Sequence, residues 1–134
     1  MRSSDCTTGV RPSPEMTADH LMERVGAFFD KGTKCNLLLC AMLEGRFGVI
    51  PIVNERKQLI GIVSQYSLLE AIVSGEDLCR LEARDLMNPT YAVSTYCPAI
   101  KVERMMRKNK LRQVPVVDAE HRLVGIVTDG EILL

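Results

Sequence analysis

The stretch VIPIVNERKQLIGIVSQYSLL (residues 49–69) decides the fold, because the chain contains an ungapped second copy of it, QVPVVDAEHRLVGIVTDGEIL (residues 113–133). Pro51 and Pro115 mark the spacing of the two copies, which is 64 positions. A shorter match lies upstream, where ADHLM precedes the first copy and ARDLM precedes the second. Internal similarity of this kind indicates two copies of one structural unit.

Each copy predicts a hairpin that is followed by a helix. Residues 49–63 and 114–127 each hold two short apolar runs around a polar turn, which is typical of paired buried strands. Ser64 and Thr128 come directly after the second run, where a hydroxyl side chain caps the first turn of a helix. We therefore expect a helix after each of these two residues.

Upstream of each hairpin, the pattern predicts one more helix and one more strand. Residues 34–44 are apolar on most sides of a helix, which predicts a buried helix, and its counterpart begins at Pro98. Extended stretches at residues 27–29 and 91–93 supply a strand before each helix. Each unit is therefore β-α-β-β-α, and the fold class is α/β (α+β).

The repeats also suggest a domain organisation. One unit alone has too small a core for comfortable stability, so we expect the two units to pack sheet to sheet. The expected parts are a disordered lead-in at residues 1–14, a first repeat at 15–76 and a second repeat at 77–134. The chain stops early in its last expected helix, which indicates a piece of a longer protein or a trimmed chain.

Charge and hydropathy exclude two classes of partner. Lys plus Arg and Asp plus Glu number 17 each, and aromatic residues make up 4%, so nothing favours binding to nucleic acid. The one basic run, residues 104–112, is interpreted as a solvated helix face and the turn after it. No run approaches the roughly 18 apolar residues that a membrane helix needs, so we expect no membrane insertion.

The residue types that carry catalysis are not grouped in the sequence. The five cysteines and two histidines have no zinc-ligand spacing, and buried, reduced thiols in a cytoplasmic protein explain the cysteine count. There is no plausible Ser/His/Asp or Cys/His set and no glycine-rich phosphate loop. We therefore expect a protein without catalytic residues or metal ligands, which is not an enzyme.

The full order of these motifs, present twice, resembles the CBS domain, which is named after cystathionine β-synthase. The hallmarks are the Leu-Met that ends each upstream match, the Val-Pro-Val-Val-Asp strand at residues 114–118, and the Gly-Ile-Val-Ser or Gly-Ile-Val-Thr strand ends at 61–64 and 125–128. The resemblance covers about residues 17–134. It implies a pair of units with pseudo-two-fold symmetry, two clefts between them, a homodimer, and an enzyme or transporter as the regulated partner.

The resemblance also implies a ligand, because many CBS pairs bind an adenosine-containing molecule such as AMP, ATP or S-adenosylmethionine in these clefts. We expect no cofactor to be required besides such a ligand. One implied site combines Ile62, Ser64 and Ser67 with Thr90 and Tyr91. The other combines Ile126, Thr128, Asp129 and Glu131 with Ala27 and Phe28.

Both copies depart from the Gly-x-x-Thr-x-x-Asp pattern of the family. Ser67 and Glu131 stand where the family has Asp, which accepts hydrogen bonds from the ribose diol. Since Glu131 keeps the carboxylate, we expect the second site to be the better adenosine site. Asp129 would repel a polyphosphate by ~1 kcal/mol or more at a few ångströms, which favours adenosine or S-adenosylmethionine over ATP.

Structural roles are the alternative for the same residues. Thr128 and Glu131 have the spacing of a capping box, and Ser64 is an adequate helix cap by itself. Core packing is the favoured interpretation of Phe28 and Tyr91. The sequence therefore predicts a non-enzymatic regulatory module that senses an adenosine ligand through its dimer conformation, with a ligand-free dimerisation or partner-docking module as the alternative.

Overall fold

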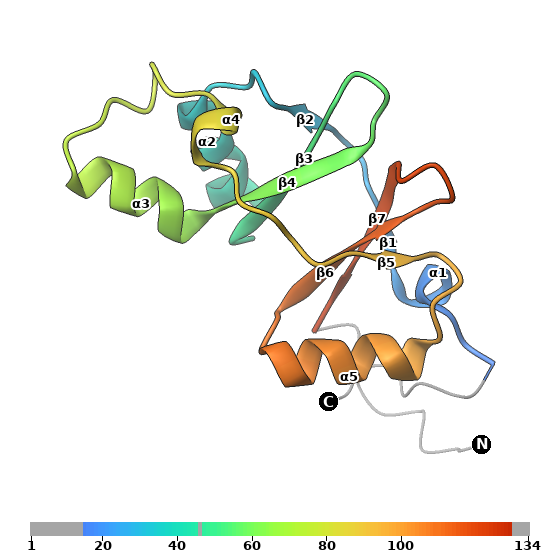
Figure 1. Cartoon of the computed structure of the whole chain (residues 1–134). Coiled ribbons are helices and arrows are strands. Elements are labelled where there is room, and N and C mark those ends of the chain that lie inside the picture. The colour runs from blue at the N-terminus through green and yellow to red at the C-terminus, as the bar shows by residue number, and fades with distance from the viewer. Residues whose placement is uncertain (1–14, 46, 130–134) are drawn as a thin grey trace. The chain divides into compact units, whose positions relative to one another are not determined.

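The computed structural model describes residues 15–45 and 47–129, and it shows a mixed α/β fold with two separate sheets (Figure 1). The chain divides into two compact units. Unit 1 joins the residues up to Gly26 with those from Tyr91 onward, and unit 2 holds Ala27–Thr90. The predicted fold class is confirmed, whereas the predicted lead-in at residues 1–14 and the helix after Thr128 lie outside the described residues.

Unit 2 is a three-stranded sheet with two helices of the first repeat packed against it. Its sheet has the order β2-β3-β4, in which β2 is parallel and β4 antiparallel to β3. Leu38 and Met42 from the first helix and Leu68 from the second join the strand residues in the core. The elements are β2 (Phe29–Asp30), α2 (Cys35–Gly45), β3 (Val49–Val53), β4 (Leu59–Ser64), α3 (Gln65–Val73) and α4 (Ala83–Leu86).

Unit 1 repeats this plan with one additional edge strand. Its sheet has the order β1-β7-β6-β5, and the β6–β7 hairpin shifts register between Val116 and Val117, as the β3–β4 hairpin does between Ile52 and Val53. The sequence repeat is therefore also a repeat of backbone register. The elements are α1 (Ala18–Leu21), β1 (Glu23–Arg24), β5 (Val93–Ser94), α5 (Ala99–Asn109), β6 (Gln113–Val117) and β7 (Leu123–Thr128).

The two sequence repeats exchange their short helices, α1 and α4. In unit 2, Ala83 at the start of α4 donates its backbone N–H to the Thr33 carbonyl at 2.8 Å. In unit 1, Ala18 at the start of α1 donates in the same way to the Cys97 carbonyl at 2.8 Å. Each compact unit thus contains the short helix of the other sequence repeat. The division at 15–76 and 77–134 therefore describes the repeats of the sequence, and the compact units have other boundaries.

Three expectations need correction. The α2 helix is buried on one face only, since Leu37 is 54% and Leu43 is 64% exposed, because α2 packs against one side of a sheet. The strands expected at 27–29 and 91–93 begin two residues later, at Phe29 and Val93. Of the described cysteines, Cys35 is buried and Cys97 is partly buried, whereas Cys40 and Cys79 are exposed, so the expectation of buried thiols is wrong for these two.

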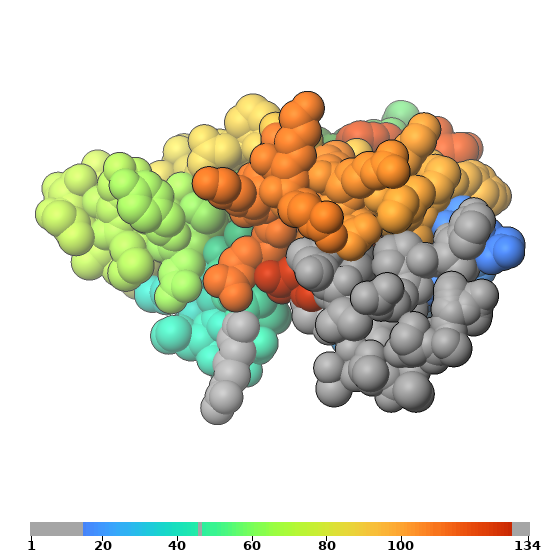
Figure 2. All heavy atoms as spheres, turned by 90° about the horizontal axis from the view of Figure 1, so that it is seen from below, coloured from blue at the N-terminus to red at the C-terminus, as the bar shows by residue number. Residues whose placement is uncertain are grey.

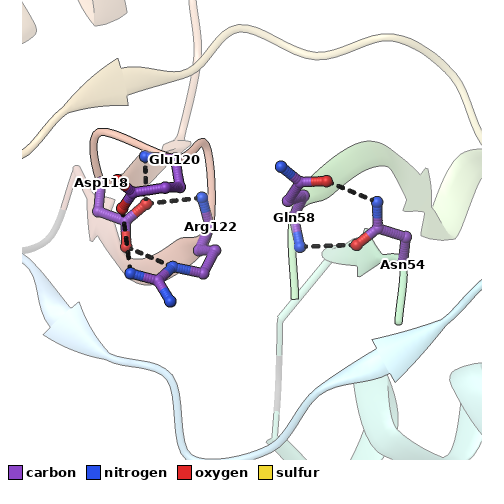
Figure 3. Close-up of polar contacts among 5 residues, drawn as sticks. All are labelled: Asn54, Gln58, Asp118, Glu120 and Arg122. Carbon is purple, nitrogen blue, oxygen red and sulfur yellow. Dashed lines mark hydrogen bonds and ion pairs between the residues drawn. The ribbon is translucent and has the colours of Figure 1, made fainter. Parts of the chain in front are cut away.

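The two hairpin turns are built alike but carry different charges (Figure 3). In the first, Asn54 Oδ1 accepts the backbone N–H groups of Arg56 and Gln58, each at 2.9 Å. In the second, Asp118 Oδ1 accepts those of Glu120 at 3.0 Å and Arg122 at 2.8 Å. The Arg122 guanidinium also donates from Nε to Asp118 Oδ2 at 2.8 Å.

Asp118→Asn is expected to remove a pH-dependent part of the stability. The backbone N–H of Arg122, followed by its side chain, holds the pKa of Asp118 below its usual value. The resulting stabilisation is complete above the unfolded-state pKa of about 3.9 and is lost as the pH falls through the lowered folded-state pKa. Asn54 shows that an amide fits this turn.

Urea unfolding of wild type and Asp118→Asn between pH 7 and pH 3 measures this effect. The wild-type advantage at neutral pH should shrink below about pH 4. A difference between the two proteins that stays constant over this range would contradict the role given to the Asp118 carboxylate.

Candidate ligand-binding site

A polar cluster lies where β4 passes into α3. Ser64 ends the strand and caps the helix, because its Oγ accepts the Ser67 backbone N–H at 3.1 Å. The Ser64 hydroxyl also donates to Ser67 Oγ at 3.1 Å. Both hydroxyl groups therefore lie at the positive end of the helix dipole, a position that suits ligand oxygen atoms.

Asn88 joins this cluster from the segment after α4. It exchanges two backbone hydrogen bonds with Ile62, at 2.8 and 2.9 Å, and its Nδ2 lies 3.5 Å from Ser67 Oγ. The structure therefore brings Ile62, Ser64 and Ser67 together, with Thr90 two residues beyond Asn88 in the same unit. Sequence reasoning missed Asn88, although its place directly after the repeated Leu-Met was a usable signal.

The surroundings of Ser67 are acidic. A pocket of about 540 Å³ extends from Ser67 and Asn88 and is also lined by Glu70, Glu76 and Asp85. Three carboxylates that line one pocket oppose a phosphate group, since like charges at short range repel by ~1 kcal/mol or more. They favour a neutral or positively charged ligand.

The second implied site is described only in part. Thr128 ends β7, and Asp129 donates its backbone N–H to the Arg112 carbonyl at 2.8 Å, as Gln65 does to Gly48 at 2.7 Å. The Arg112 guanidinium also lies 3.6 Å from Asp129 Oδ2. A cation therefore offsets part of the negative charge that we assigned to Asp129 from the sequence.

The strand β1 lies beside the middle of β7. Glu23 pairs with Ile126 and Arg24 with Gly125 in an antiparallel register. This arrangement brings the segment before Ala27 next to Ile126 within unit 1. Ala27 itself belongs to unit 2, and Glu131 lies outside the described residues.

The two aromatic candidates are surface residues. Phe28 is 40% exposed, with Lys57 Nζ 4.3 Å from its ring centroid. Tyr91 is 50% exposed, and its hydroxyl donates to Asn109 Oδ1 at 3.0 Å. The favoured interpretation of both residues as core packing is therefore wrong.

Residues 15–45 and 47–129 hold neither a candidate metal centre nor a candidate membrane span. No three His, Cys, Asp or Glu side chains of this part are grouped closely enough to hold a metal ion. None of its helices combines the length and the apolar character that crossing a membrane requires.

The sequence profile of the CBS domain matches residues 35–74 and 83–134, so the chain belongs to the CBS domain family. An uncharacterized protein of Methanopyrus kandleri is 34% identical over 94 residues, which are 69% of this chain and 48% of that protein. The chain spans about half or less of the first curated relatives that it matches. These include the homoserine O-acetyltransferase of Methanosphaera stadtmanae, of which it covers 16%.

Solved structures of CBS pairs share this fold. Hypoxic response protein I, crystallised with two coordinated zinc ions, has a TM-score of 0.77 and 26% identity, over 87% of this chain and 95% of that one. CBSX2 of Arabidopsis thaliana, crystallised in complex with AMP, has a TM-score of 0.73 and 26% identity, over 86% and 91% of the two chains.

Proposed function

We propose that this CBS pair is a non-enzymatic regulatory module that binds an adenosine-containing ligand and acts through the conformation of a homodimer. The observation that carries the proposal is the polar cluster of Ser64, Ser67 and Asn88 at the start of α3. Its hydroxyl and amide groups suit the hydroxyl groups of a ribose. The AMP complex of CBSX2 supports an adenosine ligand for this fold.

The proposal favours a ligand with little negative charge. The pocket that Ser67 lines is also lined by Glu70, Glu76 and Asp85, whose carboxylates disfavour a polyphosphate. S-adenosylmethionine, whose sulfonium is positive, and adenosine suit this pocket better than ATP. At the second site Arg112 offsets Asp129, so AMP is better tolerated there.

The regulatory role agrees with how the family occurs. The region that matches the homoserine O-acetyltransferases makes up 16% of one of those enzymes and 23% of another. A region of this size is small enough to be a module attached to the enzyme. The regulated partner in our proposal is accordingly an enzyme or transporter, and the location is the cytoplasm. A ligand-free dimerisation module is the alternative.

A thermal-melting series tests the proposal. A ligand at 100 times its dissociation constant stabilises the folded chain by about 2.7 kcal/mol, which raises Tm by several degrees. We expect S-adenosylmethionine and AMP at millimolar concentration to raise Tm, ATP to raise it less, and guanosine to serve as the control. A Tm that moves with none of the adenosine compounds would support the ligand-free alternative.

A further inference from the structure

A second pocket of unit 2 lies beside the turn of the β3–β4 hairpin. Its volume is about 440 Å³, and all of its lining residues belong to unit 2. They come from β2 and its flanking residues, from the hairpin turn, and from α4. We call this the hairpin pocket. Its charged lining residues are Asp30, Lys31, Glu55, Lys57 and Arg84, and Phe28 adds an aromatic ring.

The hairpin pocket is separate from the polar cluster at the start of α3. In the β3–β4 ladder, Val49 pairs with Ser64 at one end and Val53 pairs with Leu59 at the other. Val53 lines the hairpin pocket, whereas Ser64 belongs to the polar cluster. Since a strand rises about 3.3 Å per residue, the two ends of β3 lie ~13 Å apart. The hairpin pocket and the pocket beside Ser67 share no lining residue.

Two of the three cations in the hairpin pocket are held in place by neighbouring groups. The Nζ atom of Lys57 lies 4.3 Å from the centroid of the Phe28 ring. Arg84 donates its backbone N–H to the Lys31 carbonyl at 2.9 Å, and its Nε lies 2.8 Å from Glu82 Oε1. Because these side chains are partly ordered in the free protein, a ligand that binds them loses less conformational entropy.

The two carboxylates of the hairpin pocket do not cancel its positive charge. Asp30 Oδ1 accepts the Gly32 backbone N–H at 2.9 Å and the Thr33 hydroxyl at 3.3 Å, so this oxygen is engaged in its own loop. Lys31 and Lys57 form no ion pair with any described residue. Three cations against two carboxylates leave a net charge of one positive unit.

The matching place in unit 1 lacks these three cations. There the Asp19 backbone N–H donates to the Thr95 carbonyl at 3.2 Å, in the same way that Arg84 donates to Lys31. The two turns also share a left-handed residue, His121 with φ of 66° and Lys57 with φ of 67°. The backbone is therefore alike in both units, and it needs no cation at these positions in order to fold. The residues of unit 1 that match Lys31, Lys57 and Arg84 are Thr95, His121 and Asp19.

We propose that the hairpin pocket binds a phosphate group, which Lys31, Lys57 and Arg84 hold together. A guanidinium donates two N–H groups to two phosphate oxygens, and each ammonium supplies a compact positive charge. A phosphate group offers three free oxygens and up to two negative charges, which suits three cations better than a carboxylate does. This inference goes beyond the proposed function, because it adds a site with the opposite charge preference to the pocket beside Ser67.

The size of the hairpin pocket leaves room for more than the phosphate group. Its volume of about 440 Å³ lies within the range of roughly 300–1,000 Å³ that is usual for small-molecule sites. Phe28 and Val53 provide the apolar part of the lining. The phosphate group can therefore be free phosphate or part of a small phosphorylated molecule, and the test has to distinguish these two sources.

An NMR titration of the full chain tests this site and locates it. With inorganic phosphate and with glucose 6-phosphate, at constant ionic strength, we expect saturable shifts of the Gly32, Glu55 and Lys57 backbone amide signals. Glucose is the uncharged control and should shift none of them. A lower midpoint for glucose 6-phosphate would assign a phosphorylated molecule, and equal midpoints would assign free phosphate. The absence of saturable shifts with both phosphates up to tens of millimolar would overturn the proposal.

Matched variants exchange the cations for the residues of unit 1. At slightly alkaline pH, where a histidine side chain is neutral, Lys57→His should weaken phosphate binding about tenfold. Arg84→Asp should abolish saturable binding. Because His121 and Asp19 occupy the matching positions of unit 1, both changes suit the backbone.

Lys101→Thr is the control for the loss of one positive charge. It removes a cation from α5, a helix whose exposed side chains stand out from the surface in Figure 2 (orange). This variant should bind phosphate as the wild type does. Equal losses of affinity in Lys57→His and Lys101→Thr would show a general effect of net charge and would overturn the assignment to the hairpin pocket.

The adenosine test stays separate from this one. S-adenosylmethionine carries no phosphate, so it should shift the amide signals of Ser67 and Asn88 and leave that of Gly32 unchanged. The rise in Tm with S-adenosylmethionine should also persist in Lys57→His. Saturable phosphate binding without any adenosine effect would refute the proposed function and leave the hairpin pocket intact. The reverse result would refute the hairpin pocket alone.

Discussion

Gly125→Ala is expected to destabilise the chain by about 1–3 kcal/mol, the usual cost of an added methyl group in a packed core. A Cβ at Gly125 would stand 2.8 Å from Met22 Cγ and 2.9 Å from the Glu23 carbonyl oxygen, and it would also overlap Met22 Sδ. The side chain of Met22 has room to turn, but Glu23 is fixed by its pairing with β7. Strand β1 must therefore shift away from the sheet.

Gly61→Ala is the matched control in the other unit. There a Cβ would stand 3.0 Å from the Asn88 carbonyl oxygen and 3.3 Å from Met87 Sδ, so a smaller adjustment is enough. Urea unfolding of both variants should give a clearly larger loss for Gly125→Ala. Equal losses at the two positions would contradict the closer packing of Met22 and Glu23 on Gly125.

Leu38→Ala is expected to cost about 2–5 kcal/mol, the range for a leucine removed from a core. Leu38 is fully buried and belongs to the same core cluster as Met42, Ile50 and Leu68. The loss combines the transfer free energy of the removed atoms with the cavity left beside the sheet of unit 2. Chemical unfolding monitored by circular dichroism measures it.

Leu37→Ala is the control for this variant, one residue away on the exposed side of α2. At a protein concentration that keeps the chain monomeric, it should change the free energy of unfolding by no more than about 0.5 kcal/mol. A large loss at Leu37 together with a small loss at Leu38 would mean that α2 docks on the sheet with the opposite face.

The sequence predicted the hairpins well because alternating burial and polar turns are local signals. The repeat at Pro51 and Pro115 even carried over into an equal register shift in both hairpins. The exchange of α1 and α4 was not predicted, because each is four residues long. Their positions depend on backbone hydrogen bonds to residues distant in the sequence, such as Ala83 to Thr33.

The burial of α2 could be predicted from the sequence only in part. From its sequence, a helix with Leu37, Leu38 and Leu43 is predicted to be buried, because leucine is a residue type typical of cores. Only the position of the helix on one side of a sheet shows that Leu37 and Leu43 remain exposed in a single chain.

The candidate site was predicted in part. Ser64 and Ser67 were found because strand ends and helix caps have a sequence signature, and their hydrogen bond shows that the two are neighbours. Asn88 and Arg112 were missed as contributors, because each reaches the site from another segment of the fold.

Calorimetric titration of the chain with S-adenosylmethionine and with AMP tests the central claim most directly. The account predicts saturable binding with a dissociation constant below about 1 mM, which corresponds to roughly −4 kcal/mol. Ser67→Ala should weaken binding at the first site about fivefold, since one hydrogen bond contributes about 1 kcal/mol. Titrations that show no saturable binding of either compound up to millimolar concentration would contradict the claim that this chain binds an adenosine-containing ligand.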